Sequence, residues 1–395
     1  QPSHTSQNRL ESMAIYLDYA ATVPMSAEVL AAYTDALSVV GNPSSIHSFG
    51  QAARQMVEQA REDIALAVNA DRNEVIFTSG GTEGNNLAIK GLFWERNKDA
   101  SRKKIISAYT EHHAVIDTVE WLEQHEGAEA VWVPVHEDGL IDFDWYRNYL
   151  AENHDQIALT TLMLANNETG VITDVRKFAD VAAAFDIPMH SDAVAAFGYM
   201  PVDFAETNLS TMAISAHKVG GPVGVGALLV SRSTKITSLI QGGGQERGIR
   251  SGTLNAAGTT AFALAAKTAL QHMGEHNART RILIDQIQKY VSENIPNARF
   301  SRGSHAGLSH NAHFTFEGAK SDSLLFLLDQ AGIAASAGSA CQAGVARPSH
   351  VLLAMGRTEA EANGTLRFTL GSSTTQAEID QLLEVLPSIV ATARA

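Results

Sequence analysis

Short β-rich runs alternate with helical stretches through the middle of this chain, and this alternation constrains the fold more than any other feature. The β-rich runs are Val75–Thr78, Ile105–Ala108, Ala130–Val135, Leu159–Leu164, Pro188–Ser191, Met212–Ser215 and Gly226–Val230. Helical stretches such as Val115–Gln124 and Asp174–Phe185 lie between several of them. Strands that alternate with helices form a mainly parallel sheet covered on both faces, so we expect an α/β fold.

The C-terminal third has a different pattern, which follows a helical segment at Thr259–His272. Its predicted helices and strands are Thr280–Ile295, Ala312–Phe316, Ser321–Gln330, Leu366–Leu370 and Gln376–Thr392. This mixture predicts a smaller α+β domain. We expect residues 31–272 to form a large α/β domain, and residues 13–30 and 273–395 to form the small one. The polar segment 1–12 is expected to be a disordered tail or an expression remnant.

Charge and hydropathy argue against several classes of partner. The 395 residues carry a formal net charge of -14 at pH 7, which disfavours nucleic acid and anionic membranes. No apolar run approaches the roughly 20 residues that cross a bilayer. Gln1–Ser12 lacks the apolar stretch of a signal peptide, so we expect a cytoplasmic protein.

Disulfide and metal chemistry have little support in the sequence. Cys341 is the one cysteine, so neither an intrachain disulfide nor an all-cysteine metal site can form. Taken alone, such a cysteine is most often a small buried hydrophobe. His112 and His113 have no third ligand at a usual metal-site spacing, and we expect no metal.

Glycines interrupt the chain where the run Val75–Thr78 ends. Ser79, Gly80 and Gly81 precede a helix-compatible segment that follows Thr82. Glycines let backbone N–H groups approach a ligand, and a helix N-terminus favours an anion, so this turn is a candidate phosphate site. An ordinary strand-to-helix turn explains the same residues equally well.

Two further strand ends carry polar residues with a chemical use. Lys218 lies in a glycine-flanked turn after Met212–Ser215, and Asp192 directly follows the run Pro188–Ser191. A partly desolvated lysine can form a Schiff base, and a carboxylate on the ring nitrogen keeps pyridoxal phosphate (PLP) electron-poor. Singly, a solvated lysine and a helix-capping aspartate are common. Together with the glycine turn, they predict a PLP site in one crevice at the strand ends.

Longer segments make the prediction more specific. They are YLDYAAT (16–22), GNPSSIH (41–47), FTSGGTEGNNLAIKG (77–91), EHHAVIDT (111–118), ANNETG (165–170), HSDA (190–193), SAHK (215–218), GGGQERGIRSGT (242–253), SAGSACQAGVARPSHVL (336–352) and LRFTLG (366–371). Over Met13–Ala395 the chain resembles the cysteine desulfurases, in the class-V aminotransferase branch of fold-type I PLP enzymes. The run around Cys341 is similar to the forms with the longer catalytic loop.

The resemblance implies roles at the cofactor. Lys218 forms the Schiff base and moves protons at the substrate Cα, while Asp192 pairs with the pyridinium nitrogen. His112 stacks on the ring face and, as a catalytic residue, also exchanges protons, and Asn167 reaches the phenolic oxygen. The phosphate ligands implied are Gly81, Thr82, Ser215 and His217, together with Thr253 of the partner subunit.

The resemblance also implies a reaction. Asn42 and Arg367 hold the carboxylate of L-cysteine, and Cys341 attacks its sulfur, giving L-alanine and an enzyme persulfide. The sulfur then passes to an acceptor protein, such as an iron–sulfur scaffold, for iron–sulfur cluster or thio-cofactor assembly. A homodimer is implied. A selenocysteine lyase and a weakly active assembly partner are the alternatives.

Two positions depart from the usual pattern of these enzymes. Position 216 is alanine in place of glycine, which tightens the turn before Lys218. Position 195 is alanine where a glutamine usually donates to the phenolic oxygen. Because a hydrogen bond to a charged group contributes on the order of 1.5–3 kcal/mol, we expect Ala195 to affect rate and pH optimum rather than the class of reaction.

Overall fold

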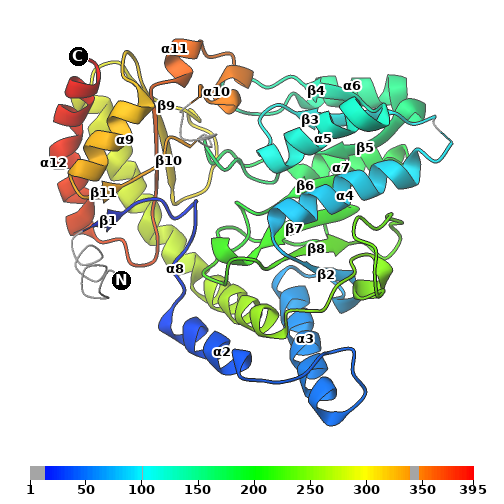
Figure 1. Cartoon of the computed structure of the whole chain (residues 1–395). Helices are drawn as coiled ribbons and strands as arrows, with labels where there is room; N and C mark the ends of the chain where they lie inside the picture. Colours follow the sequence, from blue (N-terminus) through cyan, green and yellow to red (C-terminus); the bar gives the residue numbers. More distant parts are fainter. Residues whose placement is uncertain (1–13, 100, 339–346) are drawn as a thin grey trace.

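The larger part of the molecule is built around one sheet (Figure 1). The computed structural model describes residues 14–99, 101–338 and 347–395, and in this part of the chain seven strands form the sheet. Their order is β2 (Val75–Thr78), β8 (Gly226–Val230), β7 (Thr211–Ser215), β6 (Met189–Asp192), β5 (Ile157–Thr161), β3 (Lys104–Ala108) and β4 (Glu129–Val133). β8 runs antiparallel to both of its neighbours, and the other pairs are parallel. Each predicted run overlaps one of these strands, and every pair that does not include β8 is parallel. The predicted mainly parallel sheet is therefore confirmed.

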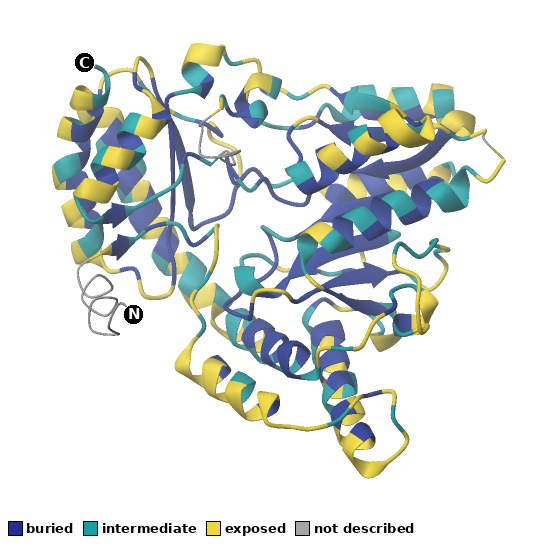
Figure 2. Ribbon diagram, viewed as in Figure 1, coloured by how far each residue is buried: buried dark blue, intermediate teal, exposed yellow. Residues whose placement is uncertain are grey.

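Helices cover both faces of the sheet because alternate strand residues point to opposite sides. Ile76 and Leu228 pack with Leu87 on one face, whereas Phe77 and Leu229 belong to the cluster on the other. The helices around this sheet are α3 (Ser48–Ala67), α4 (Gly81–Arg96), α5 (His113–Glu126), α6 (Phe143–Asn153) and α7 (Val175–Ala184). Figure 2 shows the strands buried and the outer helix faces exposed. Short 3₁₀ turns lie at Arg72–Glu74, His154–Gln156, Ala216–Lys218 and Glu246–Gly248.

A second, smaller sheet has its own apolar core. Its strands are β9 (Ala298–Phe300), β10 (Asn311–Phe316) and β12 (Thr365–Thr369), and a separate pair joins β1 (Ile15–Tyr16) to β11 (Ile333–Ala334). The helices on this side are α9 (Ser321–Gln330), α10 (His350–Ala354), α11 (Glu359–Ala362) and α12 (Gln376–Ala393). Ile15 and Leu17 pack in the same core as Phe314, Leu366 and Leu382, so both ends of the described chain build it.

One long helix, α8 (Ala256–Asn294), connects the two cores (Figure 1). Phe262 packs in the core of the large sheet and Ile287 in the core of the small one. We expected separate helices at Thr259–His272 and Thr280–Ile295, and the structure corrects this to one helix of 39 residues. The apolar pattern lapses between them because that stretch is mainly exposed, but the backbone remains helical. The predicted domain boundary at residue 272 falls inside this helix and stays a prediction.

Candidate active site

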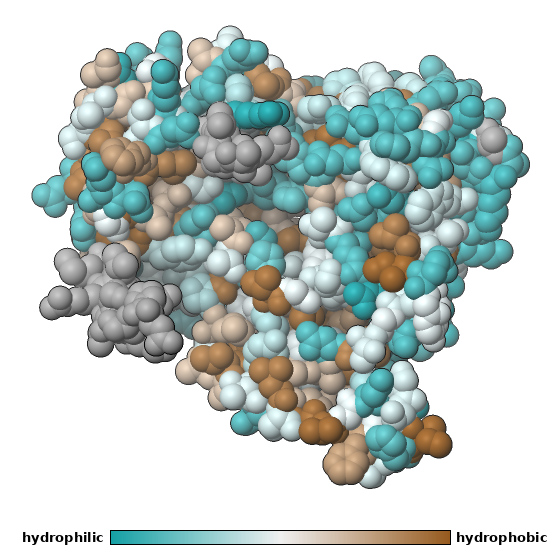
Figure 3. Space-filling view, in the orientation of Figure 1, coloured by the Kyte–Doolittle hydropathy of each residue, from teal (hydrophilic) through white to brown (hydrophobic). Residues whose placement is uncertain are grey.

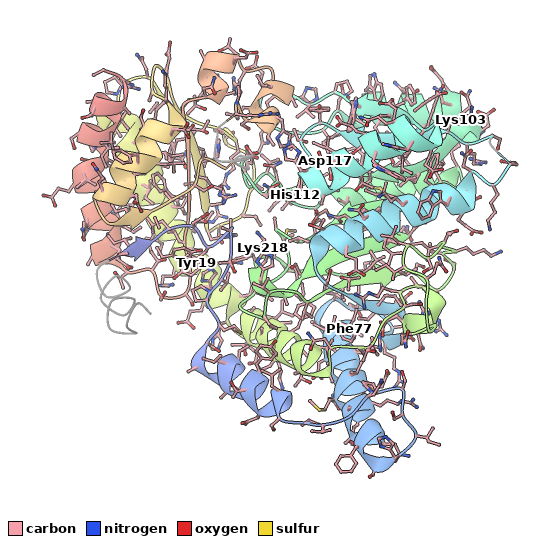
Figure 4. All side chains as sticks on the ribbon, viewed as in Figure 1. Tyr19, Phe77, Lys103, His112, Asp117 and Lys218 are labelled. Atoms are coloured by element: carbon pink, nitrogen blue, oxygen red, sulfur yellow. The ribbon has the colours of Figure 1, made fainter. Side chains whose placement is uncertain are left out.

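A cavity of about 460 Å³ lies at the carboxyl ends of the strands, between the two sheets. Figure 4 shows Tyr19, His112 and Lys218 around this space, and Figure 3 shows the surface hollowed there. The predicted site residues that line the cavity are Gly81, Thr82, His112, Asn167, Asp192, Ser215, His217, Lys218 and Arg367. Segments far apart in the sequence therefore supply one site.

Lys218 reaches the cavity from the 3₁₀ turn that follows β7. Its Nζ donates to the carbonyl oxygens of Ala20 at 2.5 Å and Ala21 at 3.1 Å. Burial, assisted by the nearby Arg367 charge, lowers the pKa of Lys218 to about 8. A larger share of the amine is therefore neutral near physiological pH, as an amine that attacks a carbonyl must be.

Asp192 ends β6 and is only 4% exposed. Its Oδ1 accepts a hydrogen bond from the Val194 backbone N–H at 2.8 Å, and its Oδ2 accepts one from the Asn85 amide at 2.6 Å. Because donors hold both oxygens, the carboxylate has a fixed orientation at the cavity wall. A carboxylate of this kind suits a protonated ring nitrogen.

The glycine turn between β2 and α4 has the features of a phosphate cup. Gly80, the N-cap of α4, has φ 151° and supplies no side-chain cap, so the first N–H groups of the helix lack that partner. A β-carbon at Gly81 would lie 2.6 Å from Val194 Cγ2, so the Val194 side chain would have to move to admit any larger residue there. The Ser215 hydroxyl nearby is buried and has no hydrogen-bond partner in the described chain. These groups fit a phosphate.

His112 is the N-cap of α5 and lies on the cavity wall. Its Nδ1 accepts a hydrogen bond from the Ala114 backbone N–H at 3.0 Å, which fixes the ring orientation. Although the ring is exposed to the cavity, surrounding protein atoms desolvate it and lower the pKa of His112. A neutral imidazole of fixed orientation suits stacking on an aromatic ring.

Arg367 enters the cavity from β12 on the small sheet. Its guanidinium donates to the Asn167 carbonyl at 2.7 Å and to Asp18 Oδ1 at 2.8 Å. Arg367 Nε and Asn167 Oδ1 are both buried without a hydrogen-bond partner in the residues described. Buried polar atoms of this kind are costly unless a ligand satisfies them, so both fit a polar ligand in the cavity.

Two predicted site residues are not brought to the cavity of this chain, and a third lies outside the described residues. Asn42 is exposed between α2 (Ala27–Leu37) and α3, and Thr253 is exposed just before α8. Neither residue lines the cavity, so their predicted roles stay predictions. Cys341 lies outside the described residues, but Ser336 and Gly338, shortly before it in sequence, line the cavity.

The sequence reasoning missed several cavity residues. His350, at the start of α10, contacts the Glu111 carbonyl through Nε2 at 2.9 Å. Glu168 is 1% exposed, and burial raises its pKa, while the Ser349 hydroxyl donates to it at 2.5 Å. Of these residues, Glu168 and His350 line the cavity, and they lie inside the distinctive segments ANNETG and SAGSACQAGVARPSHVL, which were the available signal.

The loop over residues 242–253 is fixed to the large sheet by two ion pairs. Arg61 pairs with Glu246 at 2.6 Å, and Glu246 Oε2 also accepts from the Phe77 backbone N–H at 2.7 Å. Arg250 pairs with Glu83, in the first turn of α4, at 2.7 Å. The buried Arg61–Glu246 pair therefore anchors the segment that carries Thr253.

Comparisons with known proteins agree with this site. The aminotransferase class-V family model matches residues 15–382. The IscS-like cysteine desulfurase of Mycobacterium tuberculosis is 46% identical over 381 residues, covering 96% of this chain and 97% of the relative. The cysteine desulfurase IscS of Clostridium botulinum strain Hall is 38% identical over 379 residues, covering 95% and 94%. The X-ray structure of the NifS-like protein from Rickettsia africae superposes with a TM-score of 0.85 at 29% identity, covering 96% of this chain and 99% of that one.

The fold and the site define a PLP-dependent enzyme of fold type I within the class-V aminotransferases. Within that class, the chain belongs to the cysteine desulfurase family. In the described part of the chain, no helix has both the length and the apolar character needed to cross a membrane.

Proposed function

We propose that this enzyme converts L-cysteine to L-alanine and transfers the sulfur to Cys341 as a persulfide. The observation that carries the proposal is that one cavity combines three groups. They are Lys218, hydrogen-bonded to carbonyl oxygens, the buried Asp192 carboxylate, and the N-terminus of α4, which has no side-chain cap. When bound there, PLP supplies an electron sink for negative charge at the substrate Cα. The residues of the chain hold and orient the reacting groups.

Each group of residues around the cavity has a separate role in this proposal. Lys218 holds the cofactor covalently and, once displaced by substrate, its amine removes the proton from the substrate Cα. Asp192 holds the ring nitrogen, and His112 lies against the ring face. The N-terminus of α4 takes the phosphate together with Thr82 and Ser215.

Arg367 binds the substrate carboxylate in this proposal. Its Nε is buried without a partner in the described chain, and its other nitrogens are held by Asn167 and Asp18. These contacts limit the freedom of the guanidinium, so little entropy is lost when a carboxylate binds. Asn42 is proposed to assist from the segment before α3.

The sulfur step is a displacement at sulfur. The thiolate of Cys341 attacks the thiol sulfur of the bound cysteine, so a sulfur–sulfur bond forms as the carbon–sulfur bond breaks. The electron pair of the broken bond stays with the three-carbon fragment, which gains a proton and leaves as alanine. Cys341 then carries the sulfur to an acceptor protein, such as an iron–sulfur scaffold, in the cytoplasm.

A two-fold homodimer is part of the same proposal. Large apolar side chains are exposed on and near α2 and α3, namely Leu30, Leu37, Val40, Ile46 and Phe49. Figure 3 shows brown, hydrophobic surface in the region of these helices. Exposed apolar patches of this kind mark interaction surfaces. Thr253 of the partner subunit would complete the phosphate cup, because the anchored loop presents this residue outside its own cavity.

Replacement of Cys341 tests the proposed reaction. Cys341→Ala is expected to keep the yellow cofactor and its spectral response to L-cysteine, but to lose alanine formation by at least about a hundredfold, because the sulfur acceptor is gone. Alanine and sulfide are measured in the presence of a thiol reductant, with Lys218→Ala as the control that loses the covalently held cofactor. Normal turnover by Cys341→Ala would overturn the proposal. A preference for L-selenocysteine would instead identify a selenocysteine lyase.

A further inference from the structure

Behind Asp192 a row of buried polar side chains leads away from the cavity. Asn85 comes from α4, His190 from β6 and Thr211 from β7, and their exposures are 1%, 0% and 0%. The Asn85 Nδ2 lies 2.6 Å from Asp192 Oδ2, and the Asn85 Oδ1 lies 3.0 Å from His190 Nε2. The His190 Nδ1 lies 2.9 Å from the Thr211 hydroxyl. Three elements thus meet in one continuous hydrogen-bonded row.

Chemistry fixes the direction of every bond in this row. An ionised Asp192 carboxylate only accepts, so the Asn85 amide donates to it and the Asn85 oxygen faces His190. His190 Nε2 then carries the hydrogen. Burial lowers the pKa of His190 to about 3, so the ring is neutral and its Nδ1 accepts from Thr211. All three hydrogens point toward Asp192, which is the arrangement that favours its negative charge.

The need of buried polar groups for hydrogen-bond partners does not by itself explain why this row exists. Ser107, Thr161 and Ser191 are buried in strands of the same sheet or directly beside Asp192, and their hydroxyls have no partner among the described residues. The sheet therefore tolerates unpaired hydroxyls. In contrast, the Thr211 hydroxyl belongs to a row that ends on the carboxylate facing the cavity.

We propose that Asn85, His190 and Thr211 are positioning residues that keep the Asp192 carboxylate aimed at the ring nitrogen of the cofactor. The inference rests on the role proposed above for Asp192. Each donor strengthens the next, so the influence on Asp192 decreases from Asn85 to His190 to Thr211. The charged and titratable groups that also act on Asp192 from the cavity side are Glu111, His112 and Lys218.

Thr211→Val tests the row with the smallest change in shape. Valine removes the hydroxyl and keeps the volume, and Thr161→Val makes the same change on the other side of His190, where the hydroxyl has no partner within the described chain. Thr211→Val is expected to raise the Kd for PLP about threefold and to shift the pH titration of the bound cofactor's absorbance. Thr161→Val is expected to change neither quantity.

Substitutions at His190 provide a second, stronger test. His190→Leu removes the donor to Asn85 and is expected to raise the Kd about tenfold, whereas His190→Gln places an amide N–H near the former Nε2 and is expected to recover most of the affinity. A loss that is only structural would lower the thermal stability of the cofactor-free and PLP-loaded proteins equally. Loss of the row instead reduces the rise in Tm that PLP causes.

Asp192→Asn separates the failure of this inference from failure of the proposed site. If Asp192→Asn leaves PLP affinity and the absorbance titration unchanged, Asp192 does not hold the ring nitrogen and the proposed site is wrong. If Asp192→Asn weakens PLP binding but Thr211→Val matches Thr161→Val and His190→Leu matches wild type, the site stands and the row has no positioning role. A graded loss across Asn85→Leu, His190→Leu and Thr211→Val supports the row.

Discussion

Within the described chain, the nitrogen of Lys218 donates hydrogen bonds to carbonyl oxygens and not to a carboxylate. Carbonyls stabilise an ammonium less than a carboxylate does, and burial is the larger effect on this group. Arg367 adds a repulsive charge, while Asp18 and Asp192 partly offset it. Together these effects keep the pKa of Lys218 at about 8, so the amine can change between its charged and neutral forms near physiological pH.

This balance predicts how fast the cofactor-free protein takes up PLP at each pH. With the pKa of Lys218 at about 8, the neutral fraction of the amine rises about tenfold from pH 7 to pH 9 and then levels off. The rate of covalent attachment, measured by borohydride trapping at timed intervals and mass spectrometry of Lys218, is expected to follow the same curve. A rate that continues to climb beyond pH 10 would show an unshifted lysine.

Some site residues could be predicted from sequence and others could not, for physical reasons. Lys218 and Asp192 stand at strand ends next to small residues, and the carboxyl edge of a parallel sheet is where such residues meet. Asn85 gave no such signal, because an asparagine near the start of a helix is equally typical of a solvated position. Only the packing of α4 on β6 and β7 places it against Asp192. The consequence expected for Ala195, which lines the cavity, stays a prediction.

Strands were easier to predict than the longest helix. Most strands of the large sheet are short β-rich runs bounded by turns, so their positions follow from local sequence. The middle of α8 is mainly exposed and contains Gly274, so neither periodicity nor propensity marks it as helical. The helix continues there because packing in two separate cores holds both of its ends.

Gly274 is therefore a site where α8 can be strengthened. It is exposed in the helix interior, and a β-carbon there meets no described atom within 4 Å. Gly274→Ala is expected to raise the free energy of unfolding by about 1 kcal/mol, since alanine is the better helix former. Denaturant unfolding monitored by circular dichroism measures the change.

Gly127→Ala is the matched control for this prediction. The surroundings of Gly127 are equally open, but the residue caps α5 with φ +70°, a conformation that alanine adopts only at a cost. We expect Gly127→Ala to lower the free energy of unfolding by about 1–2 kcal/mol. The same sign of change for both variants would contradict the explanation.

At the scale of the whole molecule, the chain exposes both apolar surface and a loop held in place by buried charges. The Arg61–Glu246 and Arg250–Glu83 pairs fix the 242–253 loop, while Val40 is 76% exposed and Ile46 88% exposed. In the two-fold dimer proposed above, the apolar surface would be buried and Thr253 of the partner subunit would lie at the phosphate cup.

This arrangement predicts a dimer of twice 42.2 kDa whose cofactor content depends on association. Sedimentation across a dilution series is expected to show loss of PLP absorbance as monomer appears, because each phosphate cup is then incomplete. Val40→Asp is expected to shift dissociation to higher protein concentration. Ile282→Asp, at a residue 67% exposed on α8, is the control and should leave the dilution curve unchanged. A fully loaded, active monomer would rule out the dimer.

The pairing of β1 with β11 sets an order of events during synthesis on the ribosome. Ile15 and Leu17 leave the ribosome long before their backbone partners, Gly332 and Ala334. All described strands of the large sheet emerge before residue 231 and can assemble while β1 still lacks its partner β11. The wall that carries Tyr19 and the carbonyls facing Lys218 is therefore completed last. A nascent chain can therefore fold the lysine and the carboxylate proposed to bind PLP well before it acquires a closed catalytic chamber.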